Sequence, residues 1–537
     1  MPSEAPSKSI RLHAPRASRG LVSPAVHRTV ADPSFLLLYS PLQFGENEMA
    51  KPDGSLSLPY LAGALRAAGF QVALLDISVG NDKDDLRETF FKPTALPSGL
   101  FRLGMSPTRI LEEAANYDII CISSIFTAQT RMVLDTVRLI RRAFPGKLVV
   151  AGGVNARSLA ARFFDAGVDV ISLSEGDRTI VEIGEVLRSG SRDFRSVPGI
   201  AMRVDGRIVS TPRVHVIDDL DELPVPAWDL LPLDKYWAIS RPHGGDFPPG
   251  QIIRYAEIMT SRGCPFACTY CHVSKESEDQ ETGAIGSYRV KSLQRVVREL
   301  EILKSLGVEY VFVEDDSLLA KKKRIIDIFR AMRGMGLHFA DVNGVNIVHL
   351  FTNSGGRLVP DRELLETMVE IGFETLTLPF ESANQRILDR YATRKWRTDR
   401  CDTVALVKAC EEVGLTVGGN FMIGYPDESR EEVFTTIEFA KRHMDAGLNV
   451  ALFFCVIPYP GCKLFDEAIA SGQLEEDFDP DIMKWTNPVL KNTAISAEDL
   501  MDIRRQAWIS CNRPEYIAYK TGMNVEKLAS AGASSAR

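Results

Sequence analysis

The feature that most constrains the fold of this chain is a repeated alternation of short apolar strands and helices. The continuous apolar run FLLLYSPL (35–42) is typical of a buried parallel strand, and a helical pattern over 58–70 follows it. Alternation with short loops predicts a doubly wound, Rossmann-like parallel sheet over residues 33–190. Further strand patterns, with helical patterns between the later ones, occur at 71–78, 117–125, 147–154 and 168–177.

Length and charge narrow the class of protein. A chain of 537 residues is too long for one ordinary core, so two or three domains are expected. The net charge of -8 gives no electrostatic indication of nucleic-acid or anionic-membrane binding. No apolar run reaches the roughly 18 residues that a membrane span needs.

The N-terminus and the cysteine content indicate the compartment. Residues 1–32 are rich in Pro, Ser, Arg and Ala and lack the apolar segment of a secretory signal, so we predict a disordered leader. Nine cysteines in a chain without such a signal favour a reducing, cytoplasmic environment. In that setting a tight cysteine cluster indicates metal binding or catalysis rather than disulfides.

Three of the nine cysteines lie in TSRGCPFACTYCHVS (260–274), directly after a predicted strand. Thiolates at Cys264, Cys268 and Cys271 can bind three irons of a 4Fe-4S cluster and leave one iron open, whereas electron-transfer ferredoxins supply four cysteines. A zinc site needs four ligands, and His272 is the only nearby fourth. A Cys3His zinc site is therefore the alternative.

The C-x3-C-x2-C spacing, with Tyr270 before the last cysteine, resembles the radical S-adenosylmethionine (SAM) superfamily. The resemblance implies a partial (β/α)6 barrel over about 250–470. It also implies that the open iron of the cluster chelates the amino and carboxylate groups of S-adenosylmethionine. Strand ends are where such a barrel keeps its chemistry. By resemblance, Tyr270 of the cysteine motif is a cofactor contact, and Glu314, Asp315 and Asp316 bind the methionyl amino group. Glu381 and Ser382 contact the ribose and amino acid, and Gly424 lies near the adenine. Gly424 belongs to a degenerate GxIxGxxE motif in which Asp427 takes the acidic position.

The first sheet resembles the cobalamin-binding fold at the ends of its strands. Ser123-x-Ile125, followed after 26 residues by Gly152-Gly153, matches the SxL and GG elements of that family. By resemblance these loops cradle the nucleotide tail of a corrinoid, and the implied contacts are Ser123, Ser124, Gly152, Gly153, Glu175 and Gly176. The family's DxHxxG histidine is absent, since no histidine occurs between His27 and His215. Bound cobalamin is therefore predicted to lack a histidine ligand from this sheet.

The order of the two regions is similar to that of the cobalamin-dependent radical SAM enzymes. We expect a linker over 191–249 and a small helical region over 471–537. The resemblance implies 4Fe-4S, S-adenosylmethionine and cobalamin as cofactors, with flavodoxin or ferredoxin as an external electron donor. It further implies methylation of an unactivated carbon of a small-molecule substrate, such as a secondary metabolite or a lipid, through a 5′-deoxyadenosyl radical and methylcobalamin.

Three other interpretations of the sequence stay open. The same cofactors serve non-methylating enzymes that form or rearrange rings. The Rossmann-like sheet could instead be a vestigial or substrate-binding module, or the chain could be a non-enzymatic iron–sulfur or corrinoid sensor. The sequence predicts no catalytic side chain beyond the cofactor contacts.

Overall fold

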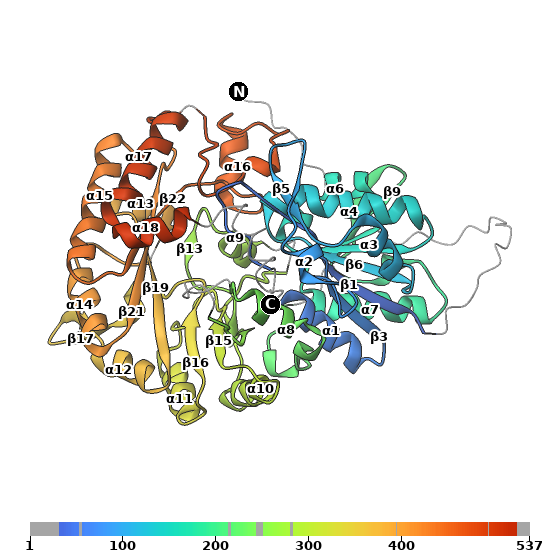
Figure 1. The fold of residues 1–537 in the computed structure, drawn as a ribbon, viewed down its shortest axis with the longest axis horizontal. Coiled ribbons are helices and arrows are strands. Elements are labelled where there is room, and N and C mark those ends of the chain that lie inside the picture. The colour runs from blue at the N-terminus through green and yellow to red at the C-terminus, as the bar shows by residue number, and fades with distance from the viewer. Residues whose placement is uncertain are drawn as a thin grey trace.

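The computed structural model describes residues 32–52, 56–212, 216–242, 251–279, 283–393, 395–491 and 493–522. Two α/β sheets lie side by side, the N-terminal one in blue to teal and the C-terminal one in yellow to orange (Figure 1). The leader predicted for 1–32 falls outside the described residues except for Asp32.

The first sheet has the strand order β10-β9-β8-β7-β6-β1-β3 in the described part of the chain. Its parallel strands are β1 (Ser34–Tyr39), β3 (Gln71–Asp76), β6 (Ile119–Ser123), β7 (Leu148–Gly152) and β8 (Val170–Ser172). β1 lies between β3 and β6, so the strand order reverses there, and ligands of such sheets bind at this switch point. The predicted doubly wound sheet is confirmed.

Helices cover both faces of this sheet. One pair, α1 and α7, packs together, while α4 packs against α3 and α6. The strand between them, β1, is buried along its whole length, as expected of a parallel strand covered on both faces. The helices are α1 (Ser57–Ala67), α3 (Pro107–Ala114), α4 (Thr130–Ala143), α5 (Val154–Ser158), α6 (Ala160–Ala166) and α7 (Gly176–Arg188).

The linker predicted for 191–249 is only partly a linker. Its first part forms β9 (Ile200–Val204) and β10 (Arg207–Ser210), which add antiparallel strands beyond β8. The hairpin turn is Asp205-Gly206, with φ values of 50° and 78°, the turn type that matches the twist of paired strands. The hairpin protects the edge of β8, which would otherwise be unpaired. After it come η3 (Leu220–Glu222), η4 (Trp228–Leu230) and α8 (Leu233–Ile239).

The second sheet has its strands in chain order, β11-β15-β16-β19-β21-β22, all parallel in the described residues. Its two end strands are not paired with each other, so the predicted partial (β/α)6 barrel is confirmed. The strands are β11 (Tyr255–Ile258), β15 (Tyr310–Val313), β16 (His338–Asp341), β19 (Phe373–Glu381), β21 (Thr416–Ile423) and β22 (Val450–Cys455). The connecting helices are α10 (Leu293–Ser305), α11 (Lys322–Met332), α12 (Arg362–Glu370), α14 (Thr403–Val413) and α15 (Arg430–Asp445).

Short elements and the C-terminal helices complete the chain. The N-terminal half adds β2 (Leu42–Phe44), β4 (Thr94–Ala95), β5 (Phe101–Leu103), α2 (Leu86–Thr89), η1 (Thr127–Gln129) and η2 (Phe194–Ser196). The barrel adds β12 (Ser261–Arg262), β13 (Ala267–Cys268), β14 (Arg289–Val290), β17 (Phe351–Ser354), β18 (Arg357–Pro360), β20 (Ala392–Thr393), η5 (Ile347–Leu350), α9 (His272–Glu278) and α13 (Gln385–Tyr391). Last come α16 (Lys463–Ala470), η6 (Pro480–Ile482), α17 (Ala497–Cys511) and α18 (Pro514–Thr521).

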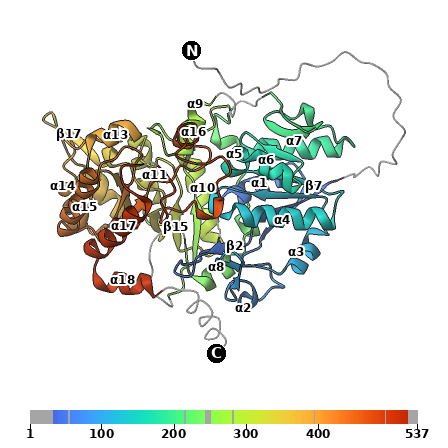
Figure 2. The ribbon, with the colours of Figure 1, turned by 90° about the horizontal axis from the view of Figure 1, so that it is seen from above.

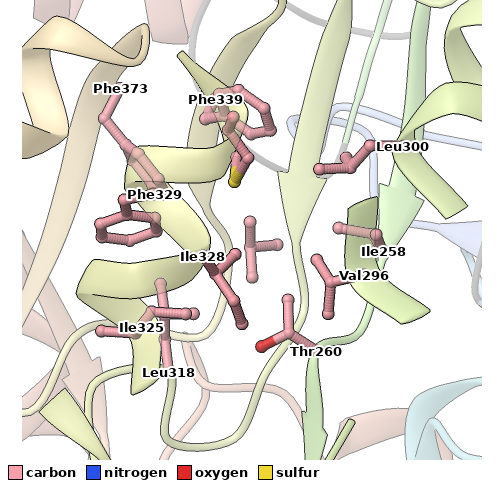
Figure 3. A pocket seen from close by; sticks show the side chains of 12 residues that line it. Ile258, Thr260, Val296, Leu300, Leu318, Ile325, Ile328, Phe329, Phe339 and Phe373 are labelled. Carbon is pink, nitrogen blue, oxygen red and sulfur yellow. The ribbon is translucent and has the colours of Figure 1, made fainter. Parts of the chain in front are cut away.

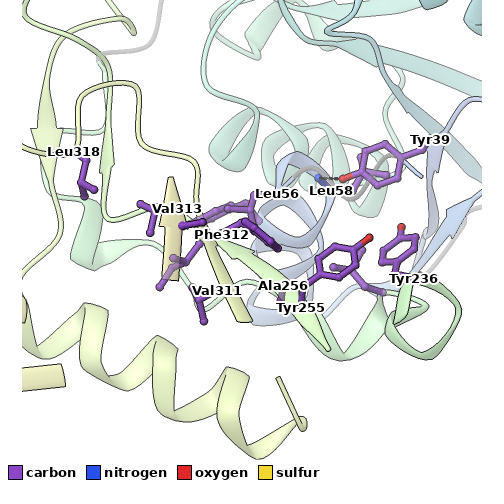
Figure 4. Packing of buried hydrophobic residues seen from close by; sticks show 14 of the residues in the cluster. Tyr39, Leu56, Leu58, Tyr236, Tyr255, Ala256, Val311, Phe312, Val313 and Leu318 are labelled. Carbon is purple, nitrogen blue, oxygen red and sulfur yellow. Dashed lines mark hydrogen bonds between the residues drawn. The ribbon is translucent and has the colours of Figure 1, made fainter. Parts of the chain in front are cut away.

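One apolar core runs through both sheets (Figure 4). Tyr39 of β1, Tyr236 of α8 and Tyr255 of β11 are all fully buried, and the rings of Tyr236 and Tyr255 stack at 6.5 Å. The Tyr236 hydroxyl donates to Asp76 at 2.8 Å, at the end of β3. The two sheets are therefore joined by packed side chains as well as by the connecting chain.

An apolar pocket lies between β11, β15 and the helices α10 and α11 (Figure 3). Thr260 is the one polar residue among those that line it. The pocket belongs to the packing of helices on the barrel and lacks the polar groups of a ligand site. Among the described residues, no helix combines the length and apolar character required to cross a membrane.

Candidate cofactor site

The three clustered cysteines lie on the loop between β11 and β15, beside the first sheet. Cys268 belongs to β13, which pairs with β20, and Cys271 directly precedes α9. Gly263 has φ +80°, and a Cβ there would lie 2.3 Å from the carbonyl oxygen of Ser287, so only glycine fits. All nine cysteines of the chain are free thiols.

The three thiols influence one another's ionisation. Burial raises the pKa of Cys264 to about 11, and the neighbouring Cys268 acts in the same direction. Burial likewise raises the pKa of Cys271, with Cys268 and Cys264 adding to the effect. Three thiols that repel one another's charge in this way would be stabilised as thiolates by bound cationic iron.

His272 does not join the cysteines as a fourth ligand in this structure. Its Nδ1 lies 3.3 Å from Glu276 Oε2, one turn along α9, and Glu276 also pairs with Arg157 of α5. Among the described residues, no three His, Cys, Asp or Glu side chains are grouped closely enough to hold a single ion. The pairing of His272 with Glu276 thus gives no support to the Cys3His zinc alternative.

The three acids after β15 have different environments. Asp315 is 3% exposed and accepts hydrogen bonds from the Thr260 N–H and hydroxyl, both at 2.6 Å, so it holds the strand end below the cysteine loop. Asp316 accepts from the Gly263 N–H at 3.0 Å, and its charge helps to raise the pKa of Cys264 and Cys271. Glu314 is half-buried, and its carbonyl oxygen accepts from Asn343 at 2.8 Å.

Glu381 ends β19 and forms a buried ion pair that the sequence did not indicate. Its backbone has φ +62°, unusual for a residue with a side chain, and its carboxylate lies 2.5 Å from Lys395 Nζ. Burial lowers the pKa of Lys395, but Glu381 and the thiols of Cys268 and Cys271 outweigh it and raise the pKa overall. Lys395 therefore lies beside the cysteine loop. No motif marks it, because it comes 14 residues after its partner.

Ser382 is fully buried one residue further along. Its hydroxyl lies 3.3 Å from Thr436 of α15 and accepts from the Asn384 N–H at 3.1 Å. These contacts tie the start of α13 to the outer helix layer. Ser382 is thus hydrogen-bonded within the protein next to Glu381, and its contact with the cofactor stays a prediction.

Aromatic rings line the side of the cysteine loop that faces β21. Tyr270 lies 6.1 Å from Tyr425, which stacks on Tyr391 at 4.7 Å. The Tyr270 hydroxyl is buried near Glu381 and Cys268 and makes no hydrogen bond of normal geometry within the described residues. A buried hydroxyl without a partner is expected where a ligand completes the site.

The loop that contains Gly424 is held by a different acid from the one in the predicted motif. Glu428 is 1% exposed and accepts from the Gly424 N–H at 2.7 Å, whereas Asp427 pairs with Arg386 and Arg390 at the surface. A Cβ on Gly424 would lie 2.2 Å from Leu500 of α17. The residue after the acidic position of the motif, Glu428, therefore holds the backbone of this loop, and Asp427 pairs with arginines outside it.

The predicted corrinoid contacts separate into open and packed positions. Ser123 ends β6 at the switch point, and its hydroxyl oxygen lies 3.2 Å from the hydroxyl oxygen of Ser57 in α1. A Cβ on Gly152 would meet only Ser172, at 3.9 Å, so this glycine borders open space. Gly153 has φ +96°, and a Cβ there would lie 2.3 Å from the Ser124 carbonyl oxygen. Ser124 accepts a hydrogen bond from Asn155 at 2.9 Å.

Glu175 and Gly176, also predicted as corrinoid contacts, lie at the start of α7, where Glu175 faces the barrel and Gly176 faces α1. The Glu175 carboxylate accepts from Arg262 at 2.9 Å, from Arg289 at 2.8 Å and from the Ile217 N–H at 2.9 Å. Gly176 packs against α1, where a Cβ added to this glycine would lie 2.9 Å from a side-chain carbon of Leu61. In both ribbon views α9 and α16 lie between the two sheets (Figure 1, Figure 2). Glu276 of α9, which follows the cysteine loop, pairs with Arg157 of α5, the helix after β7.

Family models match both halves of the chain. The radical SAM superfamily model matches residues 258–440, and the B12 binding domain model matches residues 54–184. These are the two regions in which the sequence resemblances were found. They also contain the cysteine loop and the strand ends of the first sheet.

Individual relatives extend over most of the chain. It is 32% identical over 349 residues to the uncharacterized methyltransferase PH0819 of Pyrococcus horikoshii, covering 64% of this chain and 67% of that one. It is 27% identical to cytidylyl-2-hydroxyethylphosphonate methyltransferase of Streptomyces wedmorensis, covering 79% of each. The solved structure of the radical SAM methyltransferase TsrM from Kitasatospora setae, with cobalamin and a [4Fe-4S] cluster bound, shares the fold with a TM-score of 0.58 at 16% identity, covering 82% of this chain and 75% of that one. The chain therefore belongs to the cobalamin-dependent radical S-adenosylmethionine enzymes.

Proposed function

We propose that this enzyme transfers a methyl group to an unactivated carbon of a small-molecule substrate. The observation that carries the proposal is the 32% identity to a relative named as a methyltransferase, over a match that covers two thirds of that relative. When bound, the cluster and S-adenosylmethionine supply hydrogen abstraction from carbon, and cobalamin supplies the methyl group. The remaining work of the chain is to place these groups and to exclude water.

Cys264, Cys268 and Cys271 are proposed to hold the cluster, since all three lie on one loop and the charge of Cys268 raises the pKa of both of the others. S-adenosylmethionine carries both an ammonium and a carboxylate on its methionyl end. The residues around the cysteine loop offer complementary groups, with Asp316 and Glu381 proposed for the ammonium and Lys395 for the carboxylate. The buried hydroxyl of Tyr270, near Glu381 and Cys268, is proposed to bond with the same ligand.

The corrinoid is proposed to bind at the switch point of the first sheet, along Ser123 and Gly152. The open space at Gly152 fits close approach of a ligand to the backbone. No histidine occurs between residues 28 and 214, so histidine ligation of cobalt by this sheet is not possible. The electron paramagnetic resonance spectrum of cob(II)alamin in the loaded enzyme should show no superhyperfine splitting from an imidazole nitrogen.

The partners are proposed to be a small-molecule substrate and an external electron donor, flavodoxin or ferredoxin, with no nucleic acid among them. Nine free cysteines fit a reducing, cytoplasmic setting. The chemistry of the cofactors requires an electron donor, and the acidic net charge of -8 disfavours binding of nucleic acid.

The proposal is tested with S-adenosylmethionine that carries a deuterated methyl group. Anaerobically reconstituted enzyme is incubated with this donor and with metabolite extract from a strain that lacks the gene. Methylation predicts a new labelled compound, together with 5′-deoxyadenosine and S-adenosylhomocysteine in about equal amounts, since one donor is cleaved and another recharges cobalt. Deoxyadenosine with an unlabelled, rearranged or dehydrogenated product would favour the ring-forming alternative. If neither 5′-deoxyadenosine nor S-adenosylhomocysteine formed, the result would favour a non-enzymatic sensor.

A further inference from the structure

A buried cluster of four charged side chains joins the cysteine loop to the first sheet. Arg262, two residues before Cys264, lies 2.9 Å from both Glu175 and Asp177. Arg289, on the strand paired with that of Arg262, lies 2.8 Å from Glu175. The side chains of Glu175, Asp177 and Arg289 are each less than 10% exposed. Two cations and two carboxylates balance, as buried charges require.

Both ends of this contact are closely connected to the proposed cofactor sites. Gly263 is the sole residue between Arg262 and Cys264, and its surroundings leave no room even for a Cβ. On the other side, Glu175 and Asp177 begin α7 directly after β8, beside the strand that ends in Gly152. A shift of Arg262 is therefore transmitted to the first cysteine, and a shift of its partners to the edge of the corrinoid crevice.

A second ion pair holds the other end of the cysteine loop. Arg157 of α5, just beyond Gly153, pairs with Glu276 of α9, which follows Cys271, and both side chains are less than 15% exposed. Next to this pair, Gly461 packs against α5. A Cβ added to Gly461 would lie 2.6 Å from the Val154 side chain and 2.7 Å from the Ser158 hydroxyl. The two ion pairs thus flank the cysteines, one before the first and one after the last.

We propose that Arg262 and Arg157 are positioning residues that hold the cysteine loop at two points against the corrinoid crevice and so fix the distance between cluster and cobalt. Arginine suits this task, because its planar fork binds a carboxylate in one orientation, whereas lysine acts as a point charge. The inference rests on the proposed cysteine and corrinoid sites and deepens them. It does not depend on which reaction follows.

The test uses the full-length enzyme loaded with cobalamin and cluster, both reduced to their paramagnetic states. Pulsed dipolar electron paramagnetic resonance then measures the distance distribution between cob(II)alamin and [4Fe-4S]+. We expect one narrow distribution in the wild type and a broader one in Arg262→Lys, Asp177→Asn and Arg157→Lys, with iron and cobalt per chain unchanged. The yield of labelled product per 5′-deoxyadenosine should fall about tenfold or more, since a misplacement of ~1 Å can cost up to about 10²-fold in rate.

Arg66→Lys is the matched control, because Arg66 pairs with Asp229 at the surface, where both side chains are about half exposed. It should keep the wild-type distance distribution and product ratio. A wild-type distribution in Arg262→Lys and Arg157→Lys would overturn the proposal. Loss of folding or of iron in the conservative variants would also overturn it, since the pairs would then serve stability and not position. A normal wild-type distance without any methylated product would contradict the proposed function alone.

Discussion

At the scale of single residues, Gly152 and Gly153 differ in the space that a new side chain would meet. Gly152→Leu should project into open space at the proposed corrinoid crevice, whereas Gly153→Leu would collide with the Ser124 backbone and strain a positive φ. We expect Gly152→Leu to weaken cobalamin binding by about tenfold, or about 1.4 kcal/mol, without loss of iron. Cobalamin absorbance and iron content of the purified enzyme measure this. Gly146→Leu, in an open turn, is the control, and unchanged cobalamin in Gly152→Leu would place the ligand elsewhere.

Lys395 and Glu381 allow binding and stability to be separated. Lys395→Met leaves the Glu381 carboxylate, which is 4% exposed, without its partner, and should lower the free energy of unfolding by about 3 to 5 kcal/mol. The double variant Lys395→Met/Glu381→Gln should recover most of this loss, because no charge then stays buried. It should not recover 5′-deoxyadenosine formation if the pair binds S-adenosylmethionine. Urea unfolding and single-turnover cleavage assays distinguish the two effects, and full activity of the double variant would refute the assigned role.

Some residues of the site could be predicted from the sequence, and others could not, for physical reasons. The cysteine triplet has a fixed spacing because one loop must present all three thiols, so a local pattern reveals it. Lys395 and Glu428 act through contacts set by the fold, at positions that no short pattern marks. The acids after β15 were recognised as a group. Their division into Asp315, which supports the strand end, and Asp316, which lies at the loop, depends on which side each faces.

At the scale of elements, the parallel strands of both sheets were predictable and the short antiparallel additions were missed. Buried parallel strands are continuous apolar runs, and β1 is buried at every position. The β9–β10 hairpin has a weaker pattern, since Arg203 and Val204 are exposed near its turn. Its Asp205-Gly206 turn was a usable signal. The β17–β18 hairpin is largely exposed, so burial imposed little on its sequence.

The open edge of the barrel yields a prediction at this scale. Asn512, at the end of α17, accepts from the Ala451 N–H at 2.9 Å and donates to the Ala451 carbonyl at 2.8 Å, as a neighbouring strand would. Asn512→Ala should lower the free energy of unfolding by about 2 to 4 kcal/mol, because it leaves two buried backbone groups unpaired. Urea denaturation measures this, with the exposed Asn116→Ala as control. If Asn512→Ala lowered the free energy of unfolding no more than the control does, water would have replaced the Asn512 side-chain amide.

At the scale of the whole molecule, the contacts between the two sheets could not be predicted. Arg262 and Asp177 are 85 positions apart, and Arg157 and Glu276 are 119 apart. A single sequence shows charges at both positions and nothing that pairs them. The resemblances established which cofactors each half binds, while the packing of β1, α8 and β11 into one core determines how the halves face each other.

The two halves should nevertheless load their cofactors separately. Replacing Cys264, Cys268 and Cys271 together by Ala removes every proposed iron ligand but no side chain of the first sheet, and the ion pairs of Arg262 and Arg157 involve none of the three. We expect the triple variant to lose its iron and all 5′-deoxyadenosine formation, while cobalamin content stays within about twofold of the wild type, or ~0.4 kcal/mol. Iron analysis, product chromatography and cobalamin absorbance on the same preparation measure this. Residual deoxyadenosine would contradict the assignment of the cysteines. Parallel loss of cobalamin in a folded variant would show instead that the corrinoid crevice forms only against an iron-loaded loop.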